Sequence, residues 1–304
     1  MKYLIFFLLL FFFEVKSQDT LIPVILLNDV IISEENNGFS IDDFIEYVKN
    51  DTTFYMGFKH LRYYPHDFES ELIIKNEDSS VKGFVKKKGK YHSNTKQSWI
   101  TYDTIIKEGK IFKINGDYKY YTIEAFEEVF FPIDSFNVSL SISSKKKESD
   151  SKNMRDAKTI GFSIGTDNIE RSDAGLSKKL AIFDQDMRKY YDYFIGETIY
   201  NGKECYSFTI NVKDNLSTAD IKKTLIKNIT SYFDKKNFNV IFREYKFYYN
   251  SLALKLDMHI VVEMDYVNAK HVPIEIYYKG FWDVLFFKSE FSEFRITNTN
   301  YIVN

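Results

Sequence analysis

The sequence predicts a mainly β protein (α+β), with a curved antiparallel sheet or half-open barrel of about 8–11 strands and a few short helices. Residues 254–267 alternate apolar and mostly polar side chains, which is the period of a strand with one buried face. Asn-Gly pairs at 115–116 and 201–202 separate similar runs, and such pairs are a strong hairpin signal because both residues tolerate positive φ. The segments with helical periodicity are short, so strands dominate the prediction.

The first residues predict export. Residues 1–17 read MKYLIFFLLLFFFEVKS, with Lys2 before an unbroken apolar run from Tyr3 to Phe13 and the small Ser17 at the end. This is the pattern of a signal peptide. Eleven helical residues span about 16 Å, too short for a bilayer core of about 30 Å, so we expect cleavage and not an uncleaved anchor. No later run is long enough for a transmembrane helix.

The mature chain begins with an apolar, β-branched segment at 19–32 that predicts a strand. Residues 41–50 carry apolar side chains at i, i+3, i+4 and i+7, which predicts an amphipathic helix. Further short helices are expected around 54–61, at 123–131 and at 183–194.

The strand at 254–267 is expected to form a hairpin with the strand that follows it. Residues 268–270 are expected to turn the chain, and residues 272–278 repeat the alternation. Pro273 lacks a donor, which favours an edge or bulged position. Residues 142–159 are polar and charged, so we expect a loop there within a single β-rich domain at 18–304.

Composition excludes several classes of protein. The chain has 41 basic and 43 acidic residues and a net charge of −2, so no nucleic-acid footprint is visible. Cys205 is the only cysteine; no intrachain disulfide can form, and its strand-like surroundings predict a buried structural thiol. The run Lys86–Lys88 beside Gly89 predicts a hairpin turn with solvated charges.

Candidate catalytic and metal residues do not form a convincing site. Ser163 lies in a literal G-x-S-x-G at 161–165, but a nucleophile elbow needs a strand before it and a helix after it, and here a charged loop precedes it. His60 and His66 with Asp67 and Glu69 are the best metal candidates, yet none of the five histidines has metal-site spacing. We therefore expect no catalytic residues, no cofactor and no metal.

Several segments resemble uncharacterised secreted cell-envelope proteins of Bacteroidetes, relatives of proteins that contain a carboxypeptidase-regulatory-like domain. They include NDVIISEENNGFSIDDFIEYVKN, NGDYKYYTIEAFEEVFF and HVPIEIYYKG. The C-terminal half, with YNGKECY and ITSYFDKKNFNVIFREYKFYY, is similar to periplasmic lipoprotein carriers. That resemblance implies a half-open antiparallel barrel wrapped on helices, with an apolar concave face and no catalytic residues.

These observations predict an exported, non-enzymatic cell-envelope protein, located in the periplasm, at the outer membrane or outside the cell. A curved sheet leaves a concave face that can hold an apolar ligand or lipid, and the partner could instead be another envelope protein. The expected lining residues are Tyr206, Phe208, Ile210, Leu256, Met258, Ile260, Val262 and Met264. The alternatives are that these residues form plain core under the helix at 41–50, that the chain is a serine or metal-dependent hydrolase, or that it is a small outer-membrane barrel.

Overall fold

The structure is a computed structural model of residues 1–304. It describes residues 30–31, 41–50, 53–94, 96–131, 135–137, 178–252 and 254–303. The expected signal peptide at 1–17, the polar loop at 142–159 and Ser163 lie outside the described residues.

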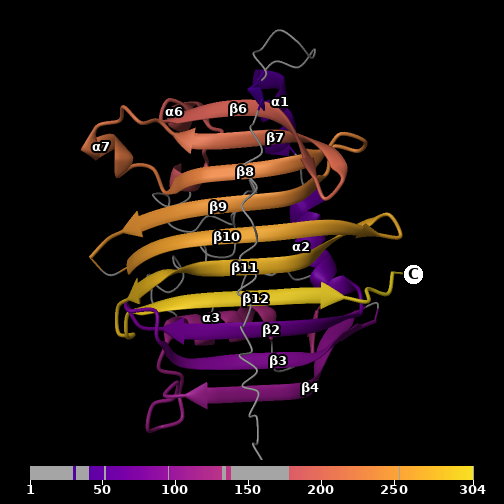
Figure 1. Cartoon of the computed structure of the whole chain (residues 1–304), viewed down its shortest axis with the longest axis vertical. Coiled ribbons are helices and arrows are strands. Elements are labelled where there is room, and N and C mark those ends of the chain that lie inside the picture. Colours follow the sequence, from indigo (N-terminus) through magenta and orange to yellow (C-terminus); the bar gives the residue numbers. More distant parts are fainter. Residues whose placement is uncertain are drawn as a thin grey trace, which may run out of the picture.

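One open antiparallel sheet organises the described chain (Figure 1). Its strand order is β1-β6-β7-β8-β9-β10-β11-β12-β2-β3-β4-β5. The bounds are β1 Val30–Ile31, β2 His66–Lys75, β3 Val81–Ser93, β4 Gln97–Gly109, β5 Phe136–Asn137, β6 Tyr191–Tyr200, β7 Lys203–Val212, β8 Ile226–Asp234, β9 Val240–Asn250, β10 Leu254–Val267, β11 Lys270–Val284 and β12 Glu290–Thr299. The predicted fold class is confirmed. The strand count is twelve because the two-residue strands β1 and β5 extend the sheet at its two ends.

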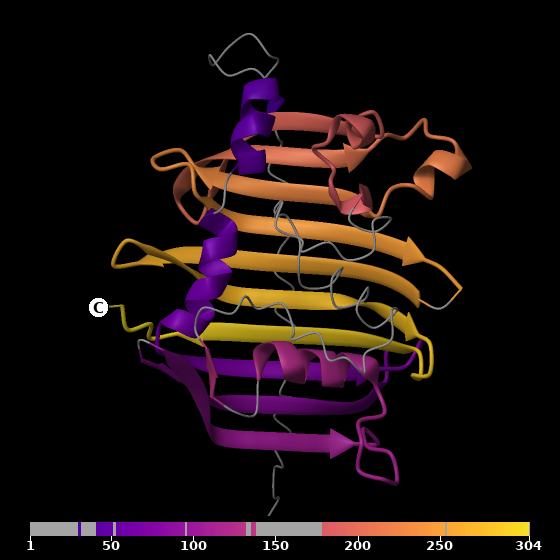
Figure 2. The same cartoon turned by 180° about the vertical axis from the view of Figure 1, so that it is seen from behind.

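Three helices lie on one face of this sheet, which we call the inner face; it includes Ile260 and Tyr278 (Figure 2). They are α1 (Ile41–Asn50), α2 (Thr53–Tyr63) and α3 (Tyr121–Phe130). The helices expected at 41–50, near 54–61 and at 123–131 are thus confirmed. The amphipathic pattern of α1 explains its packing, because Phe44, Ile45 and Val48 are all buried.

Among the described helices, none has both the length and the hydropathy needed to cross a bilayer.

Turn chemistry sets two hairpins. Asn201 and Gly202 join β6 to β7 with φ values of 49° and 74°, so the hairpin expected there is confirmed. Asn268 and Ala269, with φ values of 47° and 63°, join β10 to β11. At Asn115–Gly116 the chain makes a turn with one isolated bridge instead of a hairpin between strands.

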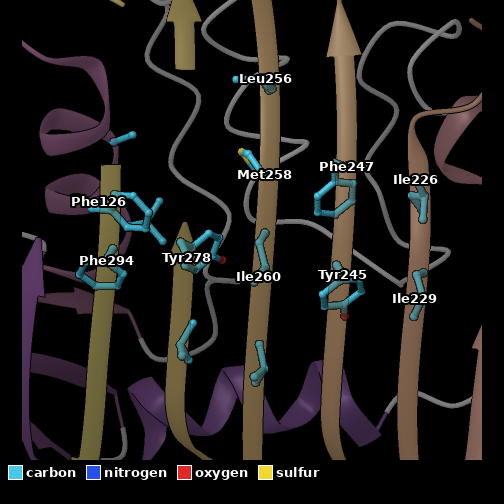
Figure 3. Packing of buried hydrophobic residues seen from close by; sticks show 14 of the residues in the cluster. Phe126, Ile226, Ile229, Tyr245, Phe247, Leu256, Met258, Ile260, Tyr278 and Phe294 are labelled. Atoms are coloured by element: carbon cyan, nitrogen blue, oxygen red, sulfur yellow. The ribbon is translucent and has the colours of Figure 1, made fainter. Parts of the chain in front are cut away.

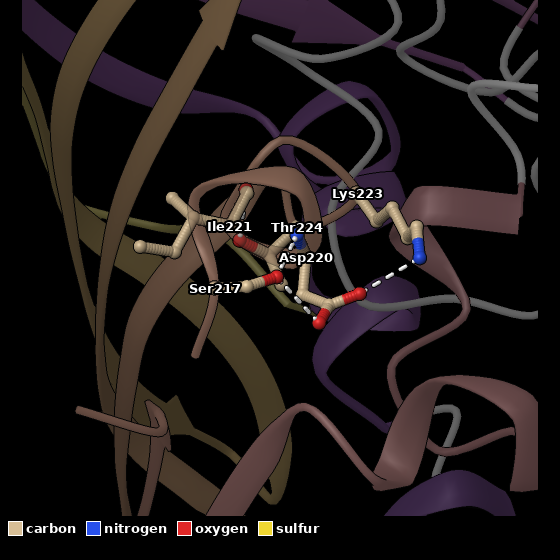
Figure 4. A network of polar contacts seen from close by, with 5 residues as sticks. All are labelled: Ser217, Asp220, Ile221, Lys223 and Thr224. Carbon is tan, nitrogen blue, oxygen red and sulfur yellow. Dashed lines mark hydrogen bonds and ion pairs between the residues drawn. The ribbon is translucent and has the colours of Figure 1, made fainter. Parts of the chain in front are cut away.

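A short capped helix, α7 (Thr218–Ile221), connects β7 to β8. The Asp220 amide donates to the Ser217 hydroxyl oxygen at 3.1 Å, and that hydroxyl donates to the Asp220 carboxylate at 2.8 Å (Figure 4). Lys223 pairs with the same carboxylate at 2.7 Å. This reciprocal cap satisfies helix donors that would otherwise be unpaired, and these interactions lower the pKa of Asp220.

Two sequence predictions are wrong in part. The helix expected at 183–194 is only the short α6 (Gln185–Arg188), because β6 begins at Tyr191 and pairs with β7 along its whole length. The hairpin turn expected at Lys86–Lys88 is the middle of β3. Lys86 and Lys88 form ion pairs with Glu71 and Glu69 of β2, so cross-strand charge pairing explains why this lysine run extends through a strand.

The bulge alternative for Pro273 is confirmed and the edge alternative is wrong. β11 lies between β10 and β12, and the pairing with β10 shifts so that Glu263 faces Glu275 while Met264 faces Pro273. At this shift β11 has one extra residue, which interrupts the regular hydrogen-bond pattern. The strand therefore tolerates a proline, which has no backbone N–H to donate.

Glu290 fixes α3 to the start of β12. Its carboxylate accepts hydrogen bonds from the Thr122 amide at 2.9 Å and the Thr122 hydroxyl at 2.7 Å. Burial raises the pKa of Glu290 to about 7, although the hydrogen bonds from Thr122 and Tyr121 and the charge of Lys82 oppose the shift. The carboxylate thus stabilises the first turn of α3 while its own ionised form is penalised by desolvation.

We predict that Glu290→Gln removes a pH dependence of stability. In the wild type, the folded state binds the Glu290 proton more tightly than the unfolded state does, so stability falls as the pH rises from about 4.5 to about 7. The difference in pKa corresponds to a loss of about 3 kcal/mol at most. Urea unfolding at pH 5 and pH 8 measures it.

The matched control is Glu293→Gln on the same strand, because Lys75 and Lys279 keep the pKa of Glu293 below its ordinary value despite burial. That variant should retain the wild-type decline between pH 5 and 8. If the Glu290→Gln variant loses stability over this interval as steeply as the wild type, the assignment is wrong.

Candidate functional site

The pairing register aligns the inner side chains of neighbouring strands into rows that cross the sheet. The central row takes one residue from each strand from β6 to β3: Tyr193, Ile210, Ile229, Tyr245, Ile260, Tyr278, Phe294, Leu72 and Val85. All of these except Tyr193 are buried. The row therefore crosses the sheet without a charged side chain.

The far row lies on the side of the central row away from α2. Its members are Ile226, Phe247, Met258, Gly280, Ser292, Ile74 and Gly83. Figure 3 shows Leu256 and Met258 of β10 farther from α2 than Ile260, on the opposite side of the central row. Apolar side chains thus extend along the strands beyond the reach of α2.

The helix row lies on the α2 side of the central row. Its members are Phe208, Ser231, Arg243, Val262, Ile276, Ile296, Ser70 and Lys87. It differs from the other rows in having two positively charged side chains, Arg243 and Lys87, which are only 6% and 5% exposed.

Helices α1 and α2 pack on the helix row. The ring of Phe44 in α1 lies 5.1 Å from that of Phe208. In α2, a Cβ atom added to Gly57 would lie 2.2 Å from Cε of Met264. The helix backbone therefore approaches β10 closely at a position where a larger side chain would force a shift.

Helix α3 packs on the central row at β11 and β12. The Phe126 ring lies 4.2 Å from that of Phe294 and 5.1 Å from that of Tyr278. These stacked and edge-on aromatic pairs add to the burial of apolar area. These contacts of the three helices do not include Met258 and Phe247 in the middle of the far row, whose side chains are nevertheless buried, at 3% and 1% exposed.

All eight predicted lining residues lie on the inner face, but in two different surroundings. Tyr206 and Phe208 contact Phe44 of α1, as expected from the alternative of plain core under that helix, and Met264 lies against α2. Val262 lies in the helix row, and the others lie in or beside the central and far rows: Ile210, Leu256, Met258 and Ile260. Their binding of a ligand stays a prediction.

Lys87 is a buried cation of the inner face that has both a counter-charge and an aromatic neighbour. Its ammonium group pairs with Glu127 of α3 at 2.5 Å and lies 4.3 Å from the ring centroid of Phe131. Burial lowers the pKa of Lys87, and the Glu127 carboxylate opposes this shift. The pair attaches α3 to β3, so the prediction that Lys86–Lys88 carries only solvated charge is wrong for Lys87.

The other candidate chemistry finds little support among the described residues. His66 is buried between the rings of Tyr91 and Tyr301, and no group of three or more possible metal ligands occurs in the described ranges. Cys205 is buried in β7, as predicted, and burial raises the pKa of its thiol.

A hollow beside α6 is lined by polar and apolar side chains: Lys178, Ala181, Asp184, Gln185, Asp186 and Met187.

Sequence analysis missed Arg243 and Lys87, although a signal for each was present. In residues 240–249, VIFREYKFYY, the arginine shares its alternate positions with Ile241, Tyr245 and Phe247. A charged residue on an otherwise apolar strand face is unusual and suggests a specific partner. Lys87 similarly lies between Val85 and Gly89 on one face of β3.

Comparisons with known proteins find distant structures only. No family model matches the chain, and no curated protein matches its sequence. A DUF1329 family protein from Desulfovibrio piger is 13% identical with a TM-score of 0.25, over 87% of this chain and 90% of that one. A LolA superfamily protein from Nitrosomonas europaea is 8% identical with a TM-score of 0.25, over 82% and 91%.

A domain from Vibrio parahaemolyticus, described as an outer membrane lipoprotein-sorting protein, is 8% identical with a TM-score of 0.28, over 86% of this chain and 90% of that one. At these identities and TM-scores the similarities carry no argument, so the function of this chain is argued from its own residues.

We predict that Glu127→Gln destabilises the protein by about 2–3 kcal/mol at pH 7, because it leaves the buried Lys87 ammonium without a counter-charge. The double variant Lys87→Met, Glu127→Leu should be more stable than the Glu127→Gln variant. The matched control is Glu69→Gln, which breaks an exposed pair with Lys88 and should cost less than about 1 kcal/mol. Equal losses for Glu127→Gln and Glu69→Gln in urea unfolding would contradict the prediction.

Proposed function

We propose that this chain is an exported, non-enzymatic protein of the cell envelope that binds an apolar ligand, a lipid or an acyl chain, on the inner face of its sheet. The observation that carries the proposal is the continuity of the central and far rows, which present apolar and aromatic side chains across the sheet. The export and the cell-envelope location rest on the sequence pattern of residues 1–17.

The dimensions of the face suit a long chain. Neighbouring strands are about 4.8 Å apart, so the five strands from β8 to β12 place their inner side chains over about 19 Å. Transfer of each CH₂ group from water to such a surface contributes about 0.8 kcal/mol. An acyl chain that lies on this face therefore gains affinity with each carbon it buries.

Gly280 and Ser292 are small residues of the far row. They are neighbours in the pairing of β11 and β12 and lie between the larger side chains of Met258 and Ile74. At Gly280 it is β10 that approaches closely, because an added Cβ atom would lie 2.4 Å from the carbonyl oxygen of Asp257 and 3.1 Å from Cγ of Met258.

A protein partner is the second candidate, and the exposure of β4 favours it. Residues 101–109 of β4 are exposed, and within the described ranges the pairing of β4 on the side away from β3 involves Gln97 and Ser98. An unpaired strand edge can accept a strand from another chain. The bulge at Asp103 weakens this candidate, because bulges and charged residues protect edges from pairing.

We predict that residues 18–304, purified without detergent, retain lipid in near-stoichiometric amount, measured by mass spectrometry of an organic extract. Met258→Trp should reduce the bound lipid at least about tenfold, equivalent to ~1.4 kcal/mol, because the larger side chain occupies the far row. The control is Val261→Trp, which places the same side chain on the other face of β10. A lipid-free wild-type extract, or equal loss in both folded variants, would contradict the proposal.

A further inference from the structure

Arg243 is a buried cation on an apolar face. It lies in the helix row of β9, between Ser231 of β8 and Val262 of β10, and its exposed fraction is 6%. Its Nε donates to the hydroxyl oxygen of Ser231 at 2.8 Å. Its guanidinium carbon lies 4.3 Å from the ring centroid of Phe54 in α2.

No carboxylate contacts Arg243 within the part of the chain that the structure describes. Lys87, in the same row, has Glu127 as its counter-charge, and Arg295 on the outer face pairs with Glu275. Removing a charge from water without a counter-charge is costly. Arg243 therefore differs from these two cations in having no counter-charge among the described residues.

A second polar group lies beside Arg243. Tyr245 is 2% exposed, and among the described residues its hydroxyl has no partner that accepts its proton. Figure 3 shows this hydroxyl directed toward α2, the side of the sheet on which Arg243 lies. Burial raises the pKa of Tyr245, and both the charge of Arg243 and a hydrogen bond from Arg243 to the hydroxyl oxygen oppose that shift. The hydroxyl is thus a neutral donor at neutral pH, where an anion could accept from it.

The chemistry of these groups selects a planar or tetrahedral oxyanion. A guanidinium group has five N–H donors in a fixed fork, and only Nε is used by Ser231. The remaining donors match two oxygens of a carboxylate or a phosphate. Phe54 covers one face of the guanidinium, so such an anion would approach in its plane.

We propose that Arg243 and the Tyr245 hydroxyl bind the anionic headgroup, a carboxylate or phosphate, of a single-chain amphiphile. Its apolar tail runs from the helix row along β9 and β10, past Ile260 to Phe247 and Met258. This inference rests on the proposed binding of apolar ligands and adds the class and orientation of the ligand. Inner-facing residues two apart on a strand are about 7 Å apart, so the tail begins within one step of the headgroup.

Binding of three probes to the full mature chain tests the proposal: hexadecanoate, hexadecanol and acetate, each by isothermal titration. We expect hexadecanoate to bind about 30-fold more tightly than hexadecanol, as a charge-assisted hydrogen-bonded contact would produce. Arg243→Gln should abolish this ratio and leave the affinity for hexadecanol within about twofold of the wild type. Arg295→Gln, on the outer face, is the matched control and should keep the wild-type ratio.

The outcomes separate this inference from the proposed function. If neither long-chain probe binds, the proposed function fails and the inference fails with it. If both bind with equal affinity to the wild type, or if Arg243→Gln keeps the ratio, the apolar face stands and the headgroup site is overturned. If acetate binds as tightly as hexadecanoate, the site takes a free anion, and the orientation of a tail is overturned.

A measurement on the wild type alone covers the case in which Arg243→Gln does not fold. Hexadecanoate labelled with ¹³C at its carboxyl carbon can be titrated in the bound state by NMR. Pairing with Arg243 should lower its pKa by about one or more compared with the same probe in vesicles of neutral lipid. An equal or higher pKa in the protein would overturn the headgroup site.

Discussion

The register of the antiparallel pairs is the constraint on which the rest of the structure depends. Because side chains alternate along a strand, a slip of one residue between two strands would move acidic and basic outer residues onto the inner face. The register from β6 to β3, which shifts only at local bulges, instead places Tyr245, Ile260, Tyr278 and Phe294 in one row. The apolar face, its rows and the positions of its few charges all follow from this alignment.

Among the buried charged groups of the described chain, Lys87, Glu290 and Arg243 are each compensated in a different way. Lys87 is paired with a carboxylate of α3. Glu290 is hydrogen-bonded by Thr122 in the first turn of the same helix. Lys87 thus attaches α3 to β3, and Glu290 attaches it to β12. Arg243 has a hydroxyl group and an aromatic ring but no anion among the described residues. This contrast, more than the apolar composition, is the basis for the class of ligand that we propose.

Much of the fold could be predicted from local patterns. The alternation in β10 and the Asn201–Gly202 pair each determine their element without reference to the rest of the chain. The prediction of a helix at 183–194 was wrong because residues 191–194 belong to β6, which pairs with β7 along its whole length. Helical periodicity within a segment does not indicate such a pairing with another strand. The site was less predictable, since the partners of Lys87 and Arg243 come from α3 and α2, far away in the sequence.

A crystal structure with 16-bromohexadecanoate tests the central claim most directly, because anomalous scattering from bromine locates the end of the chain independently of any variant. The account predicts a bromine peak on the inner face, in contact with Met258 or Leu256. A peak on the outer face, or at a surface position away from the central and far rows, would contradict it.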